Sequence, residues 1–381
     1  MTKRVLLLFA AVATFAMGVS QGQVTRARSP IRIPDIPGYR TLKCDFHVHT
    51  VFSDGNVWPQ IRAEEAWRQG LDAIAITDHI EYQPHKDDLP INHERSFEIA
   101  KIHGDDLGVL VLKGSEVTRK MPPGHFNAVF LKSSRVLDVE DWRDALRLAA
   151  GQGAFIFWNH PGWTGQQPDG ISRWYPEHTE LLEKGQLHGI EVVNGQDYYP
   201  EVHRWCLEKN LTMLGNSDIH DPAGLVWETG TVGGRPLTLV FATDRTPEAI
   251  REALFARRTA VAVNGMLIGR KEYLEPIFKG SIEVLNPSVT VRGKRSAFVQ
   301  ISNVSDIDYD LSGEEQFEEV SVPSRLVLKG GKTVLLQLQG KSETLDMKKT
   351  FDLRYVVTNL KITPDAGLEV TFPVSVTFAP E

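Results

Sequence analysis

The chain has 381 residues, of which 41% are hydrophobic and 24% are charged. These values are typical of a soluble globular protein with one large and one small domain, or two of medium size. Its 42 basic and 49 acidic side chains give a net charge of −7. No nucleic acid is expected as a partner, because nucleic-acid binders usually present a basic face.

The first residues have the features of an export signal. Lys3 and Arg4 form a short basic region, and an uncharged apolar run extends from Val5 to Val19. Small residues follow, so we predict a signal peptide over residues 1–22, cleaved after Ser20 or Gly22. The run is shorter than the roughly 20 residues of a membrane span, so no stable membrane anchor is expected. The mature protein would then be periplasmic or extracellular; an uncleaved anchor is the alternative.

From residue 40 to about 268, apolar runs alternate with amphipathic stretches. The runs that predict strands are Leu42–His49, Ala73–Asp78, Val109–Val117, Phe126–Leu131, Ala154–Trp158, Gly189–Val193, Leu211–Leu214 and Thr259–Val263. The stretches with helical spacing are Val57–Gln69, His93–His103, Asp138–Ala150, Trp174–Lys184, Pro200–Lys209 and Pro247–Arg257. This alternation predicts an α/β domain built on a parallel sheet.

The pattern changes near residue 280, where short runs begin to alternate apolar and polar residues. Examples are Ile282–Val284, Val289–Val291, Phe298–Ile301, Leu335–Leu338, Leu353–Val357 and Val370–Phe372. Such strands, separated by turns, predict an all-β sandwich over residues 280–381, with a hairpin turn at Gly330-Gly331.

The two cysteines, Cys44 and Cys206, lie in segments expected in the core. We interpret them as buried free thiols rather than a disulfide. Two thiols are also too few for a cysteine-based zinc site.

Residues that can bind metals occur at or just beyond the ends of the predicted strands. They are His47, His49, Asp54, His79, Glu116, His125, His160, Asp218 and His220. His47 and His49 are two apart, as are Asp218 and His220, which places each pair on one face of a strand. In an α/β barrel the carboxyl ends of the strands build the active site. A metal site explains this set better than core packing does. The other histidines, His85, His93, His103, His178, His188 and His203, are expected at the surface.

The same segments resemble a known family. Phe46-His47-Val48-His49-Thr50, Ser53-Asp54-Gly55, Thr77-Asp78-His79, Gly114-Ser115-Glu116, Asn159-His160-Pro161 and Ser217-Asp218-Ile219-His220 are similar to motifs of the polymerase and histidinol phosphatase (PHP) superfamily. The resemblance covers about residues 42 to 265. It implies a distorted seven-stranded (β/α) TIM-like barrel over residues 40–268 that hydrolyses phosphoesters with two or three metal ions.

The resemblance also implies a layout for three divalent ions. His47, His49, Glu116 and Asp218 would hold one, and Asp54, His79 and His220 another. Glu116, as a bridge, would hold the remaining ion with His125 and His160. Imidazole and carboxylate ligands suit Zn²⁺, Mn²⁺ or Fe²⁺. Hydroxide on such ions would attack phosphorus without a protein nucleophile.

Further residues are candidates for supporting roles. Asp78 precedes His79 on the opposite strand face and is expected to support the ligands. Glu191 and Asn194 match another stretch of the family and could do the same. Arg258 is a candidate for substrate binding, as are Arg95, Arg119, Lys120 and Arg173, although a surface role is the simpler expectation for each.

The substrate expected is a small phosphoester, with phosphodiesters slightly favoured over phosphomonoesters. An amidohydrolase-type enzyme is a rival, but it usually uses a bridging lysine where this chain has Glu116. A secreted binding protein with a decayed site is a second rival, and the complete ligand set argues against it. A polymerase-linked exonuclease is a third, and the chain has an export signal but no polymerase body.

Overall fold

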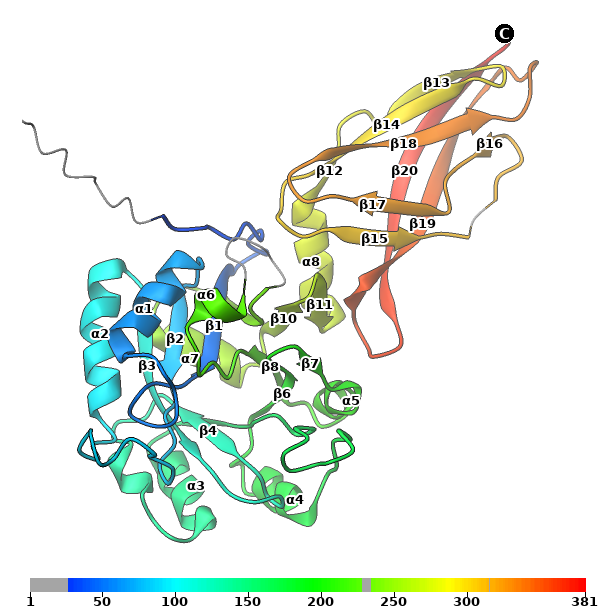
Figure 1. Ribbon diagram of the computed structural model, residues 1–381. Helices are drawn as coiled ribbons and strands as arrows, with labels where there is room; N and C mark the ends of the chain where they lie inside the picture. Colours follow the sequence, from blue (N-terminus) through cyan, green and yellow to red (C-terminus); the bar gives the residue numbers. More distant parts are fainter. Residues whose placement is uncertain (1–26, 228–233, 315) are drawn as a thin grey trace, which may run out of the picture.

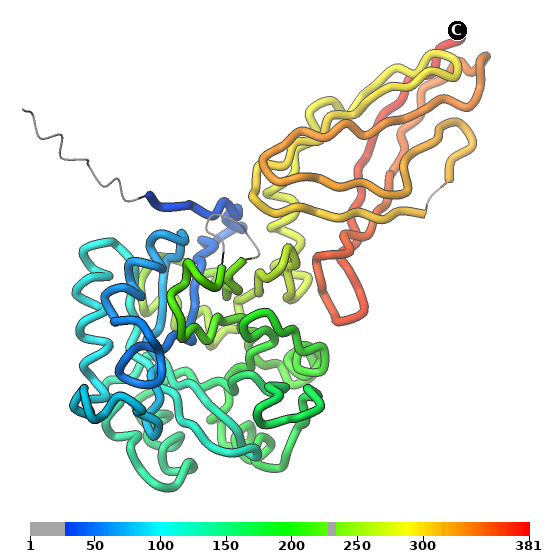
Figure 2. Tube along the Cα trace, in the orientation of Figure 1, coloured from blue at the N-terminus to red at the C-terminus, as the bar shows by residue number. Residues whose placement is uncertain are grey.

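The computed structural model describes residues 27–227, 234–314 and 316–381. The predicted signal peptide, residues 1–22, lies outside them. Figures 1 and 2 show two bodies, an α/β barrel followed by a β-sandwich. Within the described residues, no helix has both the length and the apolar character needed to cross a bilayer.

The barrel strands occupy the segments that the sequence predicts, with two additions. They are β1 (Arg40–Val48), β2 (Ala73–Ile76), β3 (Leu110–Val117), β4 (Phe126–Val129), β5 (Phe155–Trp158), β6 (Gly189–Asn194), β8 (Thr212–Asn216), β9 (Leu237–Ala242) and β10 (Thr259–Val263). The short β7 (Asp197–Tyr198) pairs with β6. Strand β9 has no counterpart among the predicted elements.

Helices cover the outside of these strands (Figure 1). They are α1 (Pro59–Arg68), α2 (Arg95–Leu107), α3 (Trp142–Gly151), α4 (Pro176–Glu183), α5 (Pro200–Glu208), the short α6 (Ala223–Val226) and α7 (Pro247–Phe255), with a 3-10 turn, η1 (Arg135–Leu137). Helices α1, α4, α5 and α7 begin with proline, whose fixed φ suits the first turn. Because helices cover one face and the barrel interior the other, strands such as β5 and β9 are buried at every residue.

The sheet is mixed rather than purely parallel. Strands β1, β2 and β3 run parallel, as do β5, β6 and β8, but β4 is antiparallel to both β3 and β5, and β9 is antiparallel to β1. Only the residues between Val117 and Phe126 join β3 to β4. That connection is too short for a crossover, so the chain must turn back on itself.

The end of β8 returns to β1 through the bridge between Val48 and Ile219, and β8 also lies against β9. The Thr238 hydroxyl lies 2.9 Å from both the backbone nitrogen and the backbone oxygen of Gly215. A Cβ atom at Gly215 would lie 2.1 Å from the side chain of Val261, so the close approach of the strands requires glycine here.

Two further elements join the barrel to the sandwich. Strand β10 and strand β11 (Met266–Gly269) form a hairpin whose turn, Asn264-Gly265, has positive φ at both residues, as a two-residue turn of this kind requires. Helix α8 (Lys271–Ser281) follows and was not predicted, because it contains Pro276, which normally ends a helix.

The sandwich consists of two sheets. One contains β12 (Ile282–Val284), β14 (Ser296–Asn303), β18 (Thr333–Gly340) and β16 (Val320–Ser321). The other contains β13 (Ser288–Arg292), β20 (Gly367–Ala379), β19 (Met347–Lys361), β15 (Tyr309–Ser312) and β17 (Arg325–Leu328). The prediction of a hairpin at Gly330-Gly331 is wrong, since this turn connects β17 of one sheet to β18 of the other.

The two domains share a continuous backbone ladder. Strand β11 pairs in parallel with the far end of β19, and the tip of the β19–β20 hairpin lies beside the barrel (Figure 1). Cys44 and Cys206 are both buried and free, which confirms the prediction for the thiols.

Candidate metal centre

The nine candidate ligands converge at one end of the barrel. Strands β1, β2, β3, β5 and β8 deliver them at or just after their carboxyl ends. His125 is the exception, because it precedes β4. Since β4 runs antiparallel to its neighbours, its amino end lies at the same edge of the barrel. The reversal of β4 therefore brings His125 to the same place as the other eight residues.

The nine residues form three overlapping groups in which the potential ligand atoms lie within 4.8 Å of one another. The groups are His47, His49, Glu116 and Asp218; Glu116, His125 and His160; and His49, Asp54, His79 and His220. Glu116 belongs to two groups, as the family resemblance implies. His49 also belongs to two, which the sequence does not predict; its Nδ1 lies 3.7 Å from Asp54 Oδ1.

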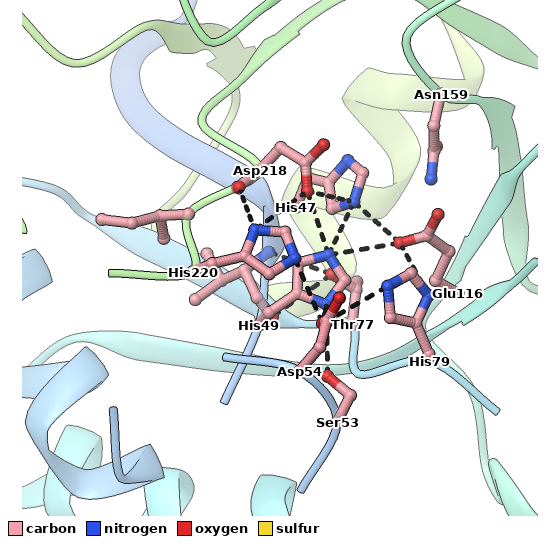
Figure 3. A network of polar contacts seen from close by, with 12 residues as sticks. His47, His49, Ser53, Asp54, Thr77, His79, Glu116, Asn159, Asp218 and His220 are labelled. Carbon is pink, nitrogen blue, oxygen red and sulfur yellow. Dashed lines mark hydrogen bonds and ion pairs between the residues drawn. The ribbon is translucent and has the colours of Figure 1, made fainter. Parts of the chain in front are cut away.

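The first group, drawn in Figure 3, has three fully buried members. His47, His49 and Glu116 have no measurable exposure. His47 Nε2 lies 3.0 Å from His49 Nε2, 2.9 Å from Glu116 Oε2 and 3.1 Å from Asp218 Oδ1. Two imidazole nitrogens at this distance repel each other unless a proton or a metal ion lies between them.

Several buried polar atoms of the site lack partners. Glu116 Oε1 and His125 Nδ1 approach to 2.7 Å, yet neither makes a hydrogen bond of acceptable geometry, and Asp54 Oδ1 has none either. Buried polar atoms are rarely left in this condition. Imidazole nitrogens and carboxylate oxygens that face one another in this way suit divalent cations such as Zn²⁺, Mn²⁺ or Fe²⁺.

The electrostatics of the first group lead to the same conclusion. Burial alone would lower the pKa of His47, but the carboxylates around it, that of Asp218 foremost, raise it well above its usual range. Burial alone would raise the pKa of Glu116, whereas the neighbouring imidazoles hold it well below its usual range. The cluster therefore stabilises positive charge among its carboxylates, and a metal ion can supply that charge in place of protons.

Glu191 supports the ligands from β6. Its Oε1 lies 2.9 Å from His47 Nδ1, which leaves His47 Nε2 facing the other ligands. Its Oε2 accepts hydrogen bonds from the backbone N–H of His160 and from the Asn194 amide, at 2.8 and 2.9 Å. Asn194 also donates to Asp218, at 3.2 Å. Both residues therefore lie where the sequence analysis expects supporting residues.

Asp78 supports the loop that carries Asp54. Its carboxylate accepts hydrogen bonds from the backbone N–H and hydroxyl of Thr50 and from the Ser53 hydroxyl, at 2.7 to 2.8 Å. Its backbone carbonyl also accepts a hydrogen bond from the backbone N–H of Glu116, at 3.1 Å, in agreement with a supporting role.

Two of the candidate ligands have left-handed backbone conformations, with φ values of 29° at His160 and 52° at Asp218. For residues other than glycine such conformations cost about 1–3 kcal/mol and cluster at functional sites. Asp218 is held by a hydrogen bond from its N–H to the His47 carbonyl, at 3.0 Å.

Three buried residues that were not predicted from the sequence, Arg62, Asp45 and Arg235, hold this end of the barrel together. The Arg62 guanidinium donates to the carbonyls of His49 and His220, at 2.8 and 2.6 Å. Asp45 accepts hydrogen bonds from Arg235, at 2.6 Å, and from the N–H of His47, at 3.1 Å. The only local signal was the presence of Asp45 within an apolar strand, because a buried carboxylate requires partners.

The structure does not bring the cationic candidates to the cluster. Arg258 lies at the start of β10, at the opposite end of the barrel, where it pairs with Glu252 and covers the Tyr39 ring. Arg95, Arg119 and Arg173 pair with Glu98, Glu81 and Asp169. No contact joins Lys120 to the nine ligands within the described chain. A substrate-binding role for Arg258 is therefore incompatible with its position.

Two histidines expected at the surface are buried instead. His178 is stacked on Trp158, with ring centroids 3.6 Å apart, and its Nε2 lies 2.8 Å from the Pro123 carbonyl. His203 Nδ1 lies 2.9 Å from the Tyr198 hydroxyl. Burial lowers the pKa of each imidazole to about 4, so both are neutral packing residues.

Comparisons with known proteins agree with both halves of this description. An Ig-like domain family matches residues 282–373. A solved two-domain protein from Bacteroides vulgatus, which contains a predicted PHP-like metal-dependent phosphoesterase, is 45% identical with a TM-score of 0.85. The match covers 91% of this chain and 99% of that one. An uncharacterized protein of Methanocaldococcus jannaschii is 35% identical over 197 residues, which are 49% of this chain and 84% of that protein. The chain therefore belongs to the PHP-like metal-dependent phosphoesterase family, in a form with a C-terminal Ig-like domain.

Proposed function

We propose that this protein hydrolyses small phosphoesters with three divalent metal ions and prefers phosphodiesters to phosphomonoesters. The observation that carries the proposal is the set of three overlapping groups of imidazoles and carboxylates that share Glu116 and His49. When bound, the ions supply positive charge to the phosphoryl oxygens and increase the acidity of water.

The residues of the chain orient this site and leave one side open. Glu191 fixes the tautomer of His47. His220 Nδ1 lies 2.8 Å from the Asp218 carbonyl, so its Nε2 faces Asp54 Oδ1, at 3.1 Å. The side chains of Asp54 and His220 are 24% and 34% exposed, whereas those of His47 and His49 are fully buried. A substrate therefore approaches from the side of Asp54 and His220.

The neighbouring hydroxyls and thiols are poorly placed to act as nucleophiles. Ser53 donates to Asp78, and Ser217 donates to Asp45. Burial raises the pKa of Cys206 to about 12 and that of Cys44 well above its usual range. This favours water over a side chain as the attacking group.

The placement of the cations supports the preference for diesters. A phosphodiester carries one negative charge, whereas an ionised monoester carries up to two. Arg119, Arg173 and Arg258 are each paired with a carboxylate elsewhere. The site thus offers little cationic support beyond its ions, which suits the less charged ester.

Hydrolysis of bis(nitrophenyl) phosphate and of nitrophenyl phosphate would test the proposal. We expect the diester to give the higher kcat/KM. Activity should disappear with a chelator, return with Mn²⁺ or Zn²⁺, and accompany about three ions per chain by elemental analysis. Full activity of the metal-free protein would refute the function. Faster hydrolysis of the monoester would refute only the preference for diesters.

The proposal includes export and a small-molecule substrate. It is supported by the basic and apolar pattern of residues 1–22 and by the net charge of −7. Mass spectrometry of the protein recovered from the periplasm or medium should find a new amino terminus near Gln21 or Gln23. An intact Met1 on soluble cytoplasmic protein would contradict export.

A further inference from the structure

An exposed aromatic side chain lies beside the second ligand group. The Trp163 ring is centred 5.3 Å from the His160 ring and 5.9 Å from the His125 ring, yet 45% of Trp163 is exposed. An indole exposed beside a ligand group offers a flat surface on which a bound organic group can stack. A substrate phosphoryl group that reaches this ligand group would place its organic substituent next to Trp163.

The loop that carries Trp163 is fixed before any substrate binds. The backbone N–H of Trp163 donates to the His160 carbonyl at 3.0 Å. The backbone carbonyl of Trp163 accepts hydrogen bonds from the backbone N–H groups of Gln166 and Gln167, at 2.9 and 2.8 Å. The Gln166 amide donates to the Arg119 carbonyl, at 2.8 Å, and the buried Gln167 amide donates to the Tyr175 hydroxyl, at 2.9 Å.

Two glycines allow this arrangement. A Cβ atom at Gly162 would lie 2.8 Å from the Gly170 carbonyl oxygen, so the loop can fold tightly only with glycine there. A Cβ atom at Gly165 would lie 2.5 Å from the Trp163 indole, so the backbone of Gly165 packs directly on the ring. The indole therefore has a defined position, and little conformational entropy is lost when a ligand stacks on it.

The polar atom of the ring is also available. Within the described residues the Trp163 Nε1–H makes no hydrogen bond, so it can donate to an oxygen of the substrate. A flat apolar surface with one donor at its edge fits planar organic groups such as an aryl ring or a nucleobase.

We propose that Trp163 is the platform that binds the organic group of the substrate and makes the enzyme selective for aryl or nucleoside phosphoesters over those of short alkyl alcohols. This inference rests on the proposed function and specifies its substrate class. Trp163 does not belong to any of the three ligand groups.

Binding of phenylphosphonate and methylphosphonate to the metal-loaded protein, measured by calorimetry, would test the platform without turnover. We expect Trp163→Ala to weaken phenylphosphonate binding about tenfold, as the loss of one stacking contact does, and to leave methylphosphonate binding unchanged. Trp163→Phe should restore most of the affinity. Phe298→Ala, at a sandwich residue with the same 45% exposure, is the matched control and should change neither.

Kinetics and metal content complete the test. Trp163→Ala should lower kcat/KM for methyl nitrophenyl phosphate less than that for bis(nitrophenyl) phosphate, with the metal content unchanged. Equal losses for both phosphonates, or loss of metal, would show that Trp163 serves the ligands rather than the substrate and would overturn the inference. If the wild-type protein hydrolysed no phosphoester, the proposed function would fail first and this inference with it.

Discussion

The barrel and the sandwich use buried polar residues in opposite ways. In the barrel, His47, His49 and Glu116 are buried with their polar atoms facing one another. In the sandwich, Asn303 is equally buried, but its amide is satisfied locally by the carbonyls of Ile307 and Leu328 and by Ser305. The barrel thus leaves buried polar atoms without hydrogen-bond partners at its open end, such as Glu116 Oε1, whereas the buried amide of Asn303 in the sandwich has its partners.

The strand patterns show the same contrast. Strand β14 of the sandwich alternates exposed and buried residues, so every second position faces solvent. Strands β5 and β9 of the barrel are buried throughout. Polar groups in such strands are costly unless they are paired, and therefore indicate function. Substitutions of buried polar residues should therefore affect activity in the barrel and not in the sandwich.

The largest effect is expected at Glu116, which two ligand groups share. Glu116→Gln keeps the shape but removes the charge, so phosphoesterase activity should fall by about three orders of magnitude. Elemental analysis should show a loss of metal, while circular dichroism shows an intact fold. Glu283→Gln, at an exposed residue of β12, is the control from the sandwich and should be silent. Near wild-type activity of Glu116→Gln would contradict the proposal that its carboxylate holds two metal ions.

Arg62 should show the next largest effect, because it is buried and donates to several backbone carbonyls as well as to the Glu65 carboxylate. Arg62→Met leaves the carbonyls of His49, Ile219 and His220 without this donor, which should cost about 3 kcal/mol in the free energy of unfolding. Urea denaturation measures this loss of stability. Metal binding by the group that contains Asp54, His79 and His220 should weaken as well.

Arg68 provides the matched control for Arg62 on the same helix. Its side chain is 45% exposed and pairs with Glu64. Arg68→Met should therefore change the free energy of unfolding by less than about 0.5 kcal/mol. Similar losses for Arg62→Met and Arg68→Met would contradict the positioning role of Arg62.

The buried His178 should give the barrel a pH dependence separate from that of the ligands. Burial lowers its pKa to about 4 in the folded protein, below the usual 6.5 that applies to the unfolded chain. As pH falls below 6.5 the unfolded chain binds the proton first, so stability present above 6.5 is lost progressively down to pH 4, by about 3 kcal/mol.

Comparison with His178→Phe isolates this contribution. Phenylalanine retains a ring against Trp158 but cannot bind a proton. Urea denaturation of both proteins between pH 7 and pH 4 should show the wild type losing more stability than the variant. Parallel pH profiles would show that His178 does not carry the effect.

The nine residues that the sequence singles out converge in the structure, and they could be found because their spacing and their places at strand ends are local features. The sequence could not reveal the antiparallel direction of β4, since alternation of apolar segments does not encode direction. Helix α8 was hidden by Pro276. Both features depend on contacts between segments that are distant in sequence, which a local pattern does not encode.

The supporting residues were harder to predict because their partners are distant in sequence. Arg62 is 158 residues from His220, and Asp45 is 190 from Arg235. Arg258 lies in a segment that resembles the family, yet it starts β10 at the opposite end of the barrel from the ligands. Which end of a strand a residue occupies decides whether it can reach the site.

The smallest effect is expected where the two domains meet at the surface. Arg204 of the barrel and Asp365 of the sandwich form an ion pair at 3.1 Å, but their side chains are 47% and 82% exposed. Asp365→Asn should change the free energy of unfolding by less than about 0.5 kcal/mol, since exposed pairs gain little over water.

Asn359, which donates to the Gly265 and Asp308 carbonyls at 2.7 and 2.8 Å, is the comparator. Asn359→Ala should cost about 1–2 kcal/mol, because it leaves partly buried backbone carbonyls without a partner. If Asp365→Asn proved the more damaging variant, the junction would depend on charge rather than on the hydrogen bonds beside the β11–β19 ladder.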